Sequence, residues 1–114
     1  MQKEITLNFY DNECHGYLEI SKSDLKKIGI YLKKFLSDFS FYSRKTNSFY
    51  FEEDCDATRI IKAIKELNYK INFKNKFVNY LYFENSNFVR TTERNWDYII
   101  NNASKSDESY KIKK

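Results

Sequence analysis

Proline is absent from this 114-residue chain, and glycine, cysteine and histidine are scarce. Two isolated glycines, Gly16 and Gly29, form no glycine-rich phosphate-binding loop. Two distant cysteines, Cys14 and Cys55, provide neither a disulfide framework nor a Cys-x-x-Cys pair. The sequence also lacks a serine nucleophile elbow and a paired metal motif. We therefore predict that the protein is not an enzyme and has no cofactor.

Long hydrophobic runs are also missing. No segment approaches the roughly 20 apolar residues of a membrane helix, and the opening residues, Met1 to Glu4, lack the apolar stretch of a signal peptide. We expect a soluble protein in the cytoplasm of the host cell, with no membrane partner.

Aromatic residues are abundant, with ten phenylalanines and ten tyrosines. Together with 41% hydrophobic residues, they argue for a folded core and against intrinsic disorder. The net charge is +4, and the segment from Ala103 to Lys114 carries +2 of it with little apolar content. We expect one domain over residues 1–102 and a disordered basic tail over residues 103–114.

Hydrophobic periodicity predicts the elements of this domain. Alternating or β-prone runs predict strands over residues 5–10, 15–20, 39–42, 49–51, 70–74, 77–83 and 88–92. Helical spacing predicts a helix that begins at Ser21 or Ser23, weakened or split at Gly29, a second helix over 57–67 and a short one over 93–102. The order and short links indicate an α+β fold, a single small domain whose antiparallel or mixed sheet is covered on one face by two helices.

An acidic cluster precedes the second predicted helix. It holds four carboxylates in five positions: Glu52, Glu53, Asp54 and Asp56. The cluster could bind a divalent cation, supply acid/base pairs, or imitate the phosphate spacing of DNA on a basic groove of another protein. Equally, acids in the first turn stabilise a helix, with Asp54 or Asp56 as its N-cap. A calcium loop is not predicted, because the cluster has no glycine.

Cys14 and the only histidine, His15, are neighbours, and Cys55 lies in the acidic cluster. A thiol with an imidazole could form a nucleophile and base, or the three residues could bind zinc. Adjacent residues on a strand point to opposite faces, however, so Cys14 and His15 do not readily converge. We expect buried cysteines and a surface histidine instead.

Aromatic residues cluster between Phe39 and Phe51, around a polar turn that contains Arg44. A single layer of helices buries only one face of a sheet, so some tyrosines should be exposed as interface anchors. The candidates are Tyr42, Tyr50, Tyr80 and Tyr82. Core packing and a nucleic-acid stacking platform bordered by Arg44 are the alternatives.

Several short motifs resemble those of small proteins encoded by phages and plasmids. The matching stretches are His15-Gly16-Tyr17-Leu18-Glu19-Ile20, Ser40-Phe41-Tyr42-Ser43, Phe49-Tyr50-Phe51-Glu52-Glu53-Asp54-Cys55-Asp56-Ala57 and Val89-Arg90. Phe51 replaces the usual leucine, and the resemblance extends from about Cys14 to Arg94. It implies a mobile-element accessory protein, and by analogy with small non-enzymatic phage proteins an anti-defence protein of the anti-CRISPR kind.

The leading hypothesis is therefore inhibition of a host defence protein, such as a CRISPR effector, by occlusion. Exposed tyrosines would anchor the partner, and the acids would compete with nucleic acid for a basic channel. The predicted contact residues are Glu52, Glu53, Asp54, Asp56, Tyr42, Tyr50 and Arg44.

Two other hypotheses remain. A nucleic-acid-binding regulator would use basic residues and bind with strong salt dependence. Those residues are Lys26, Lys27, Lys33, Lys34 and Arg44. A thiol or metal enzyme would use Cys14, His15 and Cys55.

Overall fold

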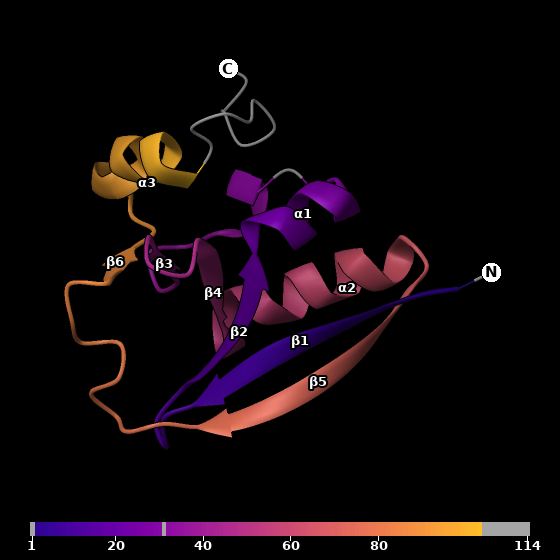
Figure 1. Ribbon diagram of the computed structural model, residues 1–114, viewed down its shortest axis with the longest axis horizontal. Coiled ribbons are helices and arrows are strands. Elements are labelled where there is room, and N and C mark those ends of the chain that lie inside the picture. The colour runs from indigo at the N-terminus through magenta and orange to yellow at the C-terminus, as the bar shows by residue number, and fades with distance from the viewer. Residues whose placement is uncertain (1, 31, 104–114) are drawn as a thin grey trace.

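A six-stranded mixed sheet forms the centre of the protein (Figure 1), in a computed structural model that describes residues 2–30 and 32–103. Its strands are β1 (Lys3–Asp11), β2 (Gly16–Ser21), β3 (Phe41–Ser43), β4 (Ser48–Glu52), β5 (Tyr69–Phe77) and β6 (Phe88–Arg90). The helices are α1 (Lys22–Ile28), α2 (Thr58–Glu66) and α3 (Trp96–Ala103). The shorter turns are η1 (Leu32–Phe35), η2 (Glu53–Ala57) and η3 (Glu93–Asn95). The predicted α+β fold is confirmed.

Two predictions concern the ends of the domain and its relation to membranes. The predicted disordered tail lies outside the described residues, apart from Ala103 at the end of α3. Within residues 2–30 and 32–103, no helix combines the length and the apolar character that crossing a membrane requires.

The strands follow the order β5-β1-β2-β4-β3-β6. β1 and β2 form one antiparallel hairpin and β3 and β4 form another. β5 instead lies parallel to β1, with Ile5 opposite Ile71 and Leu7 opposite Phe73. A parallel neighbour needs a crossover connection, and α2 lies in the chain between β4 and β5. The sheet is therefore mixed.

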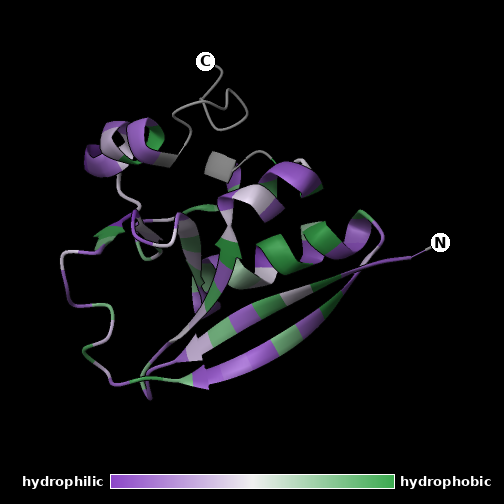
Figure 2. Cartoon of the chain, viewed as in Figure 1, coloured by the Kyte–Doolittle hydropathy of each residue, from purple (hydrophilic) through white to green (hydrophobic). Residues whose placement is uncertain are grey.

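One face of the sheet carries the main core under the helices. Apolar residues alternate along β1 and β5 and gather on α2, as the green segments in Figure 2 show. Residues from the strands and all three helices share this core: Leu7, Leu18, Ile20, Leu25, Ile28, Tyr42, Phe49, Phe51, Ala57, Ile60, Ile64, Trp96 and Ile99. Removal of these large side chains from water is the main stabilising contribution of this face.

The first helix is shorter than its apolar spacing alone predicts. The Ser21 hydroxyl caps α1 by accepting a hydrogen bond from the Asp24 amide at 3.1 Å. Gly29 ends the helix with a left-handed φ of 80°, and its amide donates to the Leu25 carbonyl at 2.9 Å. The predicted split at Gly29 is confirmed, and η1 follows it.

The opposite face of the sheet holds a second, aromatic core. Its buried members are Tyr17, Phe41, Tyr50 and Phe83. Phe83 was predicted at the end of a strand over residues 77–83, but it belongs to residues 78–87, which form turns and irregular chain after β5. This segment places the Phe83 ring 4.5 Å from that of Tyr17 and 5.4 Å from that of Phe41. The predicted strand over residues 77–83 is therefore wrong.

The second core also overturns the predicted contact role of two tyrosines. Tyr42 and Tyr50 are each 1% exposed, because Tyr42 packs under the helices and Tyr50 under the segment with Phe83. Neither ring can anchor a partner. The exposed tyrosines of the predicted set are Tyr80 at 59% and Tyr82 at 38%.

Gly16, at the start of β2, has no room for a side chain. A Cβ atom there would lie 2.7 Å from Cε2 of Phe9 and 2.9 Å from Oε1 of Glu53. We expect Gly16→Ala to lower the free energy of unfolding by about 1–3 kcal/mol, the usual cost of overpacking, as measured by urea denaturation. Gly29→Ala is a useful comparison, because it meets no atom within 4 Å and tests only the cost of positive φ. If Gly16→Ala has the same free energy of unfolding as the wild type, this description of the packing around Gly16 is wrong.

Candidate functional site

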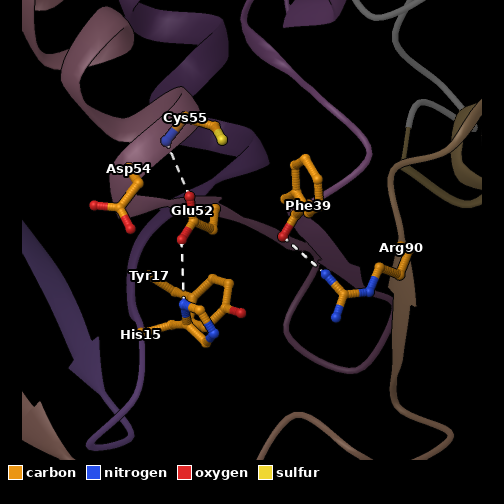
Figure 3. A pocket seen from close by; sticks show the side chains of 7 residues that line it. All are labelled: His15, Tyr17, Phe39, Glu52, Asp54, Cys55 and Arg90. Carbon is orange, nitrogen blue, oxygen red and sulfur yellow. Dashed lines mark hydrogen bonds and ion pairs between the residues drawn. The ribbon is translucent and has the colours of Figure 1, made fainter.

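A cavity of about 320 Å³ opens where β2, β4, η2 and β6 meet (Figure 3). Its lining residues are His15, Tyr17, Phe39, Glu52, Asp54, Cys55 and Arg90. Only Tyr17 and Glu52 are buried, and the other five are exposed. The cavity thus has a buried floor and a solvent-accessible rim.

The turn between β1 and β2 presents His15 to this cavity. The Asn12 side chain is buried, and its Oδ1 accepts hydrogen bonds from the amides of Cys14 at 3.1 Å and His15 at 2.8 Å. Such side-chain bonding stabilises a tight turn. His15 Nδ1 lies 3.5 Å from Oε2 of Glu52, which comes from the end of β4.

The acidic cluster divides into buried and exposed members. Glu52 is 5% exposed and caps η2, because its Oε1 accepts from the Cys55 amide at 2.9 Å. The predicted N-cap, Asp54 or Asp56, is therefore wrong, since η2 begins at Glu53 and Glu52 is its N-cap. Glu53 and Asp54 are exposed and remain available to a partner.

Asp56 is completely buried, so its predicted direct contact with a partner is wrong. Its Oδ2 accepts from the Ser37 amide and hydroxyl, both at 2.8 Å, and from the Ser40 hydroxyl. Its Oδ1 accepts from Arg59 at 3.1 Å. Asp56 therefore ties the chain that precedes β3 to the start of α2. Glu52 is likewise too buried for an extended contact.

The segment held by Asp56 carries Phe39, whose side chain is 57% exposed at the cavity. The Phe39 carbonyl accepts from Arg90 at 3.0 Å, and the Arg90 guanidinium lies 4.3 Å from the Phe41 ring centroid. Hydrogen bonding and ring contact thus position both Phe39 and Arg90 on the rim.

Both cysteines are exposed and free, which corrects the expectation of buried thiols. Cys55 and His15 line the same cavity, so the structure brings together two residues that were considered as a catalytic pair. Partial desolvation, and then the carboxylates of Glu52, Asp56 and Asp54, raise the pKa of the Cys55 thiol. A raised pKa reduces the thiolate fraction, whereas a nucleophilic cysteine needs a lowered pKa.

A second cavity of about 400 Å³ shares His15, Tyr17 and Arg90 with the first. Its remaining lining residues are Asn12, Cys14, Phe41, Tyr80, Leu81, Phe83 and Glu84. Tyr80 and Leu81 are 59% and 55% exposed. We call the surface formed by the two cavities and their rims the cavity face.

Arg44 lies outside the cavity face. It is exposed in the turn that joins β3 to β4 and lines neither cavity. Lys26, Lys27 and Lys34 are also exposed. The sequence therefore predicted correctly that these basic residues lie on the surface, but none of them belongs to the cavity face.

Sequence reasoning missed Phe39, Arg90 and Leu81 as site residues. Phe39 was assigned to a strand and Leu81 to another, and in both cases irregular chain exposes the side chain. Arg90 was noticed only as part of a motif. Its place in the Val89-Arg90 motif, within the predicted strand 88–92, was the only sequence feature that could have indicated a functional role for Arg90.

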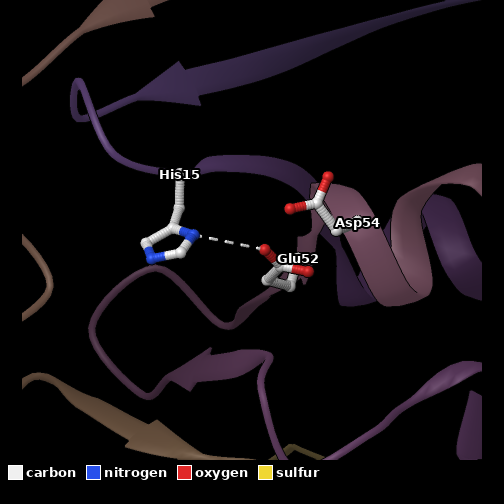
Figure 4. A group of neighbouring side chains, drawn as sticks. All are labelled: His15, Glu52 and Asp54. Carbon is white, nitrogen blue, oxygen red and sulfur yellow. Dashed lines mark ion pairs between the residues drawn. The ribbon is translucent and has the colours of Figure 1, made fainter.

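Three residues of the cavity face have the donor atoms of a metal site. His15, Glu52 and Asp54 each offer one ligand atom, and these atoms lie within 4.8 Å of one another (Figure 4). The set combines an imidazole nitrogen with carboxylate oxygens, a combination suited to zinc and related metals.

Comparison of the chain with protein-family models, curated proteins and solved structures finds no match in any of the three. The resemblance to small phage and plasmid proteins therefore stays a prediction. What the protein does must be inferred from the chemistry of the cavity face.

Proposed function

We propose that this chain is a protein of a phage or other mobile element that acts in the host cytoplasm and inhibits a defence system by binding a CRISPR effector. One observation carries the mechanism: exposed apolar side chains and exposed carboxylates lie together on the cavity face. Phe39 and Asp54 line one cavity, and Tyr80 and Leu81 line the adjoining one. The phage origin is supported only by the sequence motifs.

The charge of the cavity face favours a basic partner. Among the described residues that line the two cavities, Glu52, Asp54 and Glu84 are acidic and Arg90 is basic, which gives a net charge of −2. The whole chain has a net charge of +4. A locally acidic surface on a basic protein complements a basic channel that otherwise holds nucleic acid.

The exposed rings supply the other part of an interface. Phe39 and Tyr80 are 57% and 59% exposed, and Leu81 is 55% exposed. Large exposed apolar side chains at the edge of a concavity are typical anchors of protein interfaces. These residues replace the buried Tyr42 and Tyr50 in the proposed mechanism.

A binding role without catalysis is favoured by the cavity's chemistry. The carboxylates around Cys55 disfavour its thiolate form. The proposal therefore assigns these groups to recognition.

The test is a double charge reversal, Glu53→Lys with Asp54→Lys. We expect the wild-type chain to block target binding by one effector in a panel of purified CRISPR effectors. The double variant should bind that effector at least tenfold more weakly, because like charges at an interface repel. Fluorescence anisotropy at two salt concentrations measures both affinity and its electrostatic part.

Glu66→Lys is the matched control. Glu66 is exposed at the far end of α2, about 20 Å along the helical path from Glu53. This variant should bind like the wild type. Full effector activity across the panel would contradict the inhibitor proposal, and an unchanged affinity of the folded double variant would contradict the acidic mechanism alone.

Nucleic-acid binding is a second candidate, favoured by β5 at the edge of the sheet. Lys70, Lys74 and Lys76 are exposed on one face of this strand, and the exposed rings of Phe73 and Phe77 lie on the other. Basic residues and exposed rings are both used by surfaces that bind single-stranded nucleic acid. A mobility-shift assay with mixed oligonucleotides distinguishes the candidates, because only this one predicts that the chain binds oligonucleotides, with an affinity that falls steeply with salt.

A further inference from the structure

The cavity face brings together three metal-binding side chains from separate parts of the chain. His15 precedes β2, Glu52 ends β4, and Asp54 lies in η2. Their ligand atoms lie within 4.8 Å of one another. In a tetrahedral zinc site the ligand atoms are about 3.4 Å apart, given metal–ligand bonds of about 2.0–2.2 Å. The ligand atoms therefore lie at most about 1.4 Å farther apart than in a bound state.

One ligand is fixed, and the other two can adjust. Glu52 is 5% exposed, and the Cys55 amide holds its Oε1 at 2.9 Å. Its other oxygen, Oε2, lies 3.5 Å from His15 Nδ1, which is longer than an ordinary hydrogen bond. His15 and Asp54 are exposed, so small rotations of their side chains can close the remaining distance.

The backbone around His15 is already ordered for this role. The amides of Cys14 and His15 both donate to Asn12 Oδ1, which fixes the turn that carries the imidazole. Gly16, the residue that follows His15, packs against the Phe9 ring, and this contact restricts the movement of Gly16. Little conformational entropy is therefore lost when the imidazole becomes a ligand.

Local charge also favours a cation. Glu52, Glu53 and Asp54 follow one another, and Glu52 is buried. The arginines nearby are engaged elsewhere, since Arg59 pairs with Asp56 and Arg90 donates to the Phe39 carbonyl. A divalent cation would offset the repulsion between the carboxylates of Glu52 and Asp54.

We propose that His15, Glu52 and Asp54 bind one divalent transition-metal ion of the zinc class. The imidazole nitrogen distinguishes this site from those for calcium and magnesium, which prefer oxygen ligands only and more of them. Three protein ligands leave a fourth position open toward the 320 Å³ cavity. A water molecule or a side chain of a bound partner can occupy that position.

Binding of zinc chloride to the metal-free full chain tests the proposal, with isothermal titration calorimetry as the measurement. We expect one equivalent of zinc to bind to the wild type. His15→Ala and Asp54→Asn should each weaken binding at least tenfold, since each removes a ligand. Both residues are exposed, so both variants should keep the wild-type circular dichroism spectrum.

Glu53→Gln is the matched control, because it removes the same charge as Asp54→Asn but no ligand. It should retain wild-type affinity, as should a Cys14→Ser, Cys55→Ser double variant. Four results would overturn the proposal: no zinc binding, undiminished binding by His15→Ala, equal losses in Glu53→Gln and Asp54→Asn, or loss in the cysteine double variant. The measurement involves no effector, so its outcome is independent of the proposed function.

Discussion

Asp56→Ala should lower the free energy of unfolding by about 3–5 kcal/mol, the largest effect expected from a single substitution in this protein. The carboxylate is completely buried and accepts hydrogen bonds from Ser37, Ser40 and Arg59. Its removal leaves the buried Ser40 hydroxyl and the Ser37 donors without their acceptor, at about 1–3 kcal/mol for each unsatisfied buried group. Urea denaturation at neutral pH measures the loss.

Two variants separate the hydrogen-bonding role of Asp56 from its charge. Asp56→Asn retains one acceptor oxygen, so it should be more stable than Asp56→Ala. Asp54→Ala removes an equal charge from an exposed position and should change stability by less than about 0.5 kcal/mol. If Asp56→Ala and Asp54→Ala unfold at the same urea concentration, the buried network contributes nothing and our description of it is wrong.

The network around Asp56 also links stability to the proposed function. Ser37 and Ser40 flank Phe39, and Asp56 holds both serines. Loss of Asp56 should therefore release the segment that presents the Phe39 ring to a partner. In this way a completely buried residue controls the geometry of the cavity face.

Local sequence patterns predicted the helices of this fold well, because each pattern depends only on residues within its own segment. The serine before α1, the positive φ of Gly29 and the apolar spacing of α2 each depend on neighbouring residues. The order of the elements predicted an antiparallel or mixed sheet, but not the parallel pairing of β1 with β5 that makes it mixed, since this pairing joins residues about 66 positions apart along the chain.

The second core was beyond local prediction for a physical reason. Whether Tyr50 is exposed depends on Phe83, which reaches it from a segment without regular structure. Alternation along β4 shows that two faces exist, but not what covers the second one. The same limit applies to the acidic cluster, where only the folded chain separates the exposed Asp54 from the buried Asp56.

His15 shows how a local rule can miss a site. Cys14 and His15 were predicted to point apart as neighbours on a strand, but both lie in the turn before β2 and both line the second cavity. The imidazole is instead positioned beside Glu52. Glu52 lies 37 residues later in the sequence, and no spacing rule connects two residues so far apart. Long-range pairing of β2 with β4 creates this proximity.

The second large effect concerns alkaline pH, where the buried tyrosines should destabilise the fold. Burial raises the pKa of Tyr42 to about 12, and mainly burial raises the pKa values of Tyr10, Tyr17 and Tyr50 as well. The unfolded chain loses these protons near pH 10, whereas the folded chain keeps them. Stability is therefore fully present below about pH 10 and falls as the pH rises toward 12.

At pH 11 the loss due to Tyr42 alone should be about 1 kcal/mol, since its unfolded form is then mostly ionised and its folded form is not. Tyr42→Phe removes the titrating group, together with a 2.9 Å hydrogen bond to Asn47 worth about 1 kcal/mol. The variant should be less stable than the wild type at pH 8 but lose less stability between pH 8 and pH 11. Tyr80→Phe, at an exposed ring, should follow the wild-type profile. Urea denaturation at each pH provides the comparison, and parallel profiles for wild type and Tyr42→Phe would show that burial of this hydroxyl does not control alkaline stability.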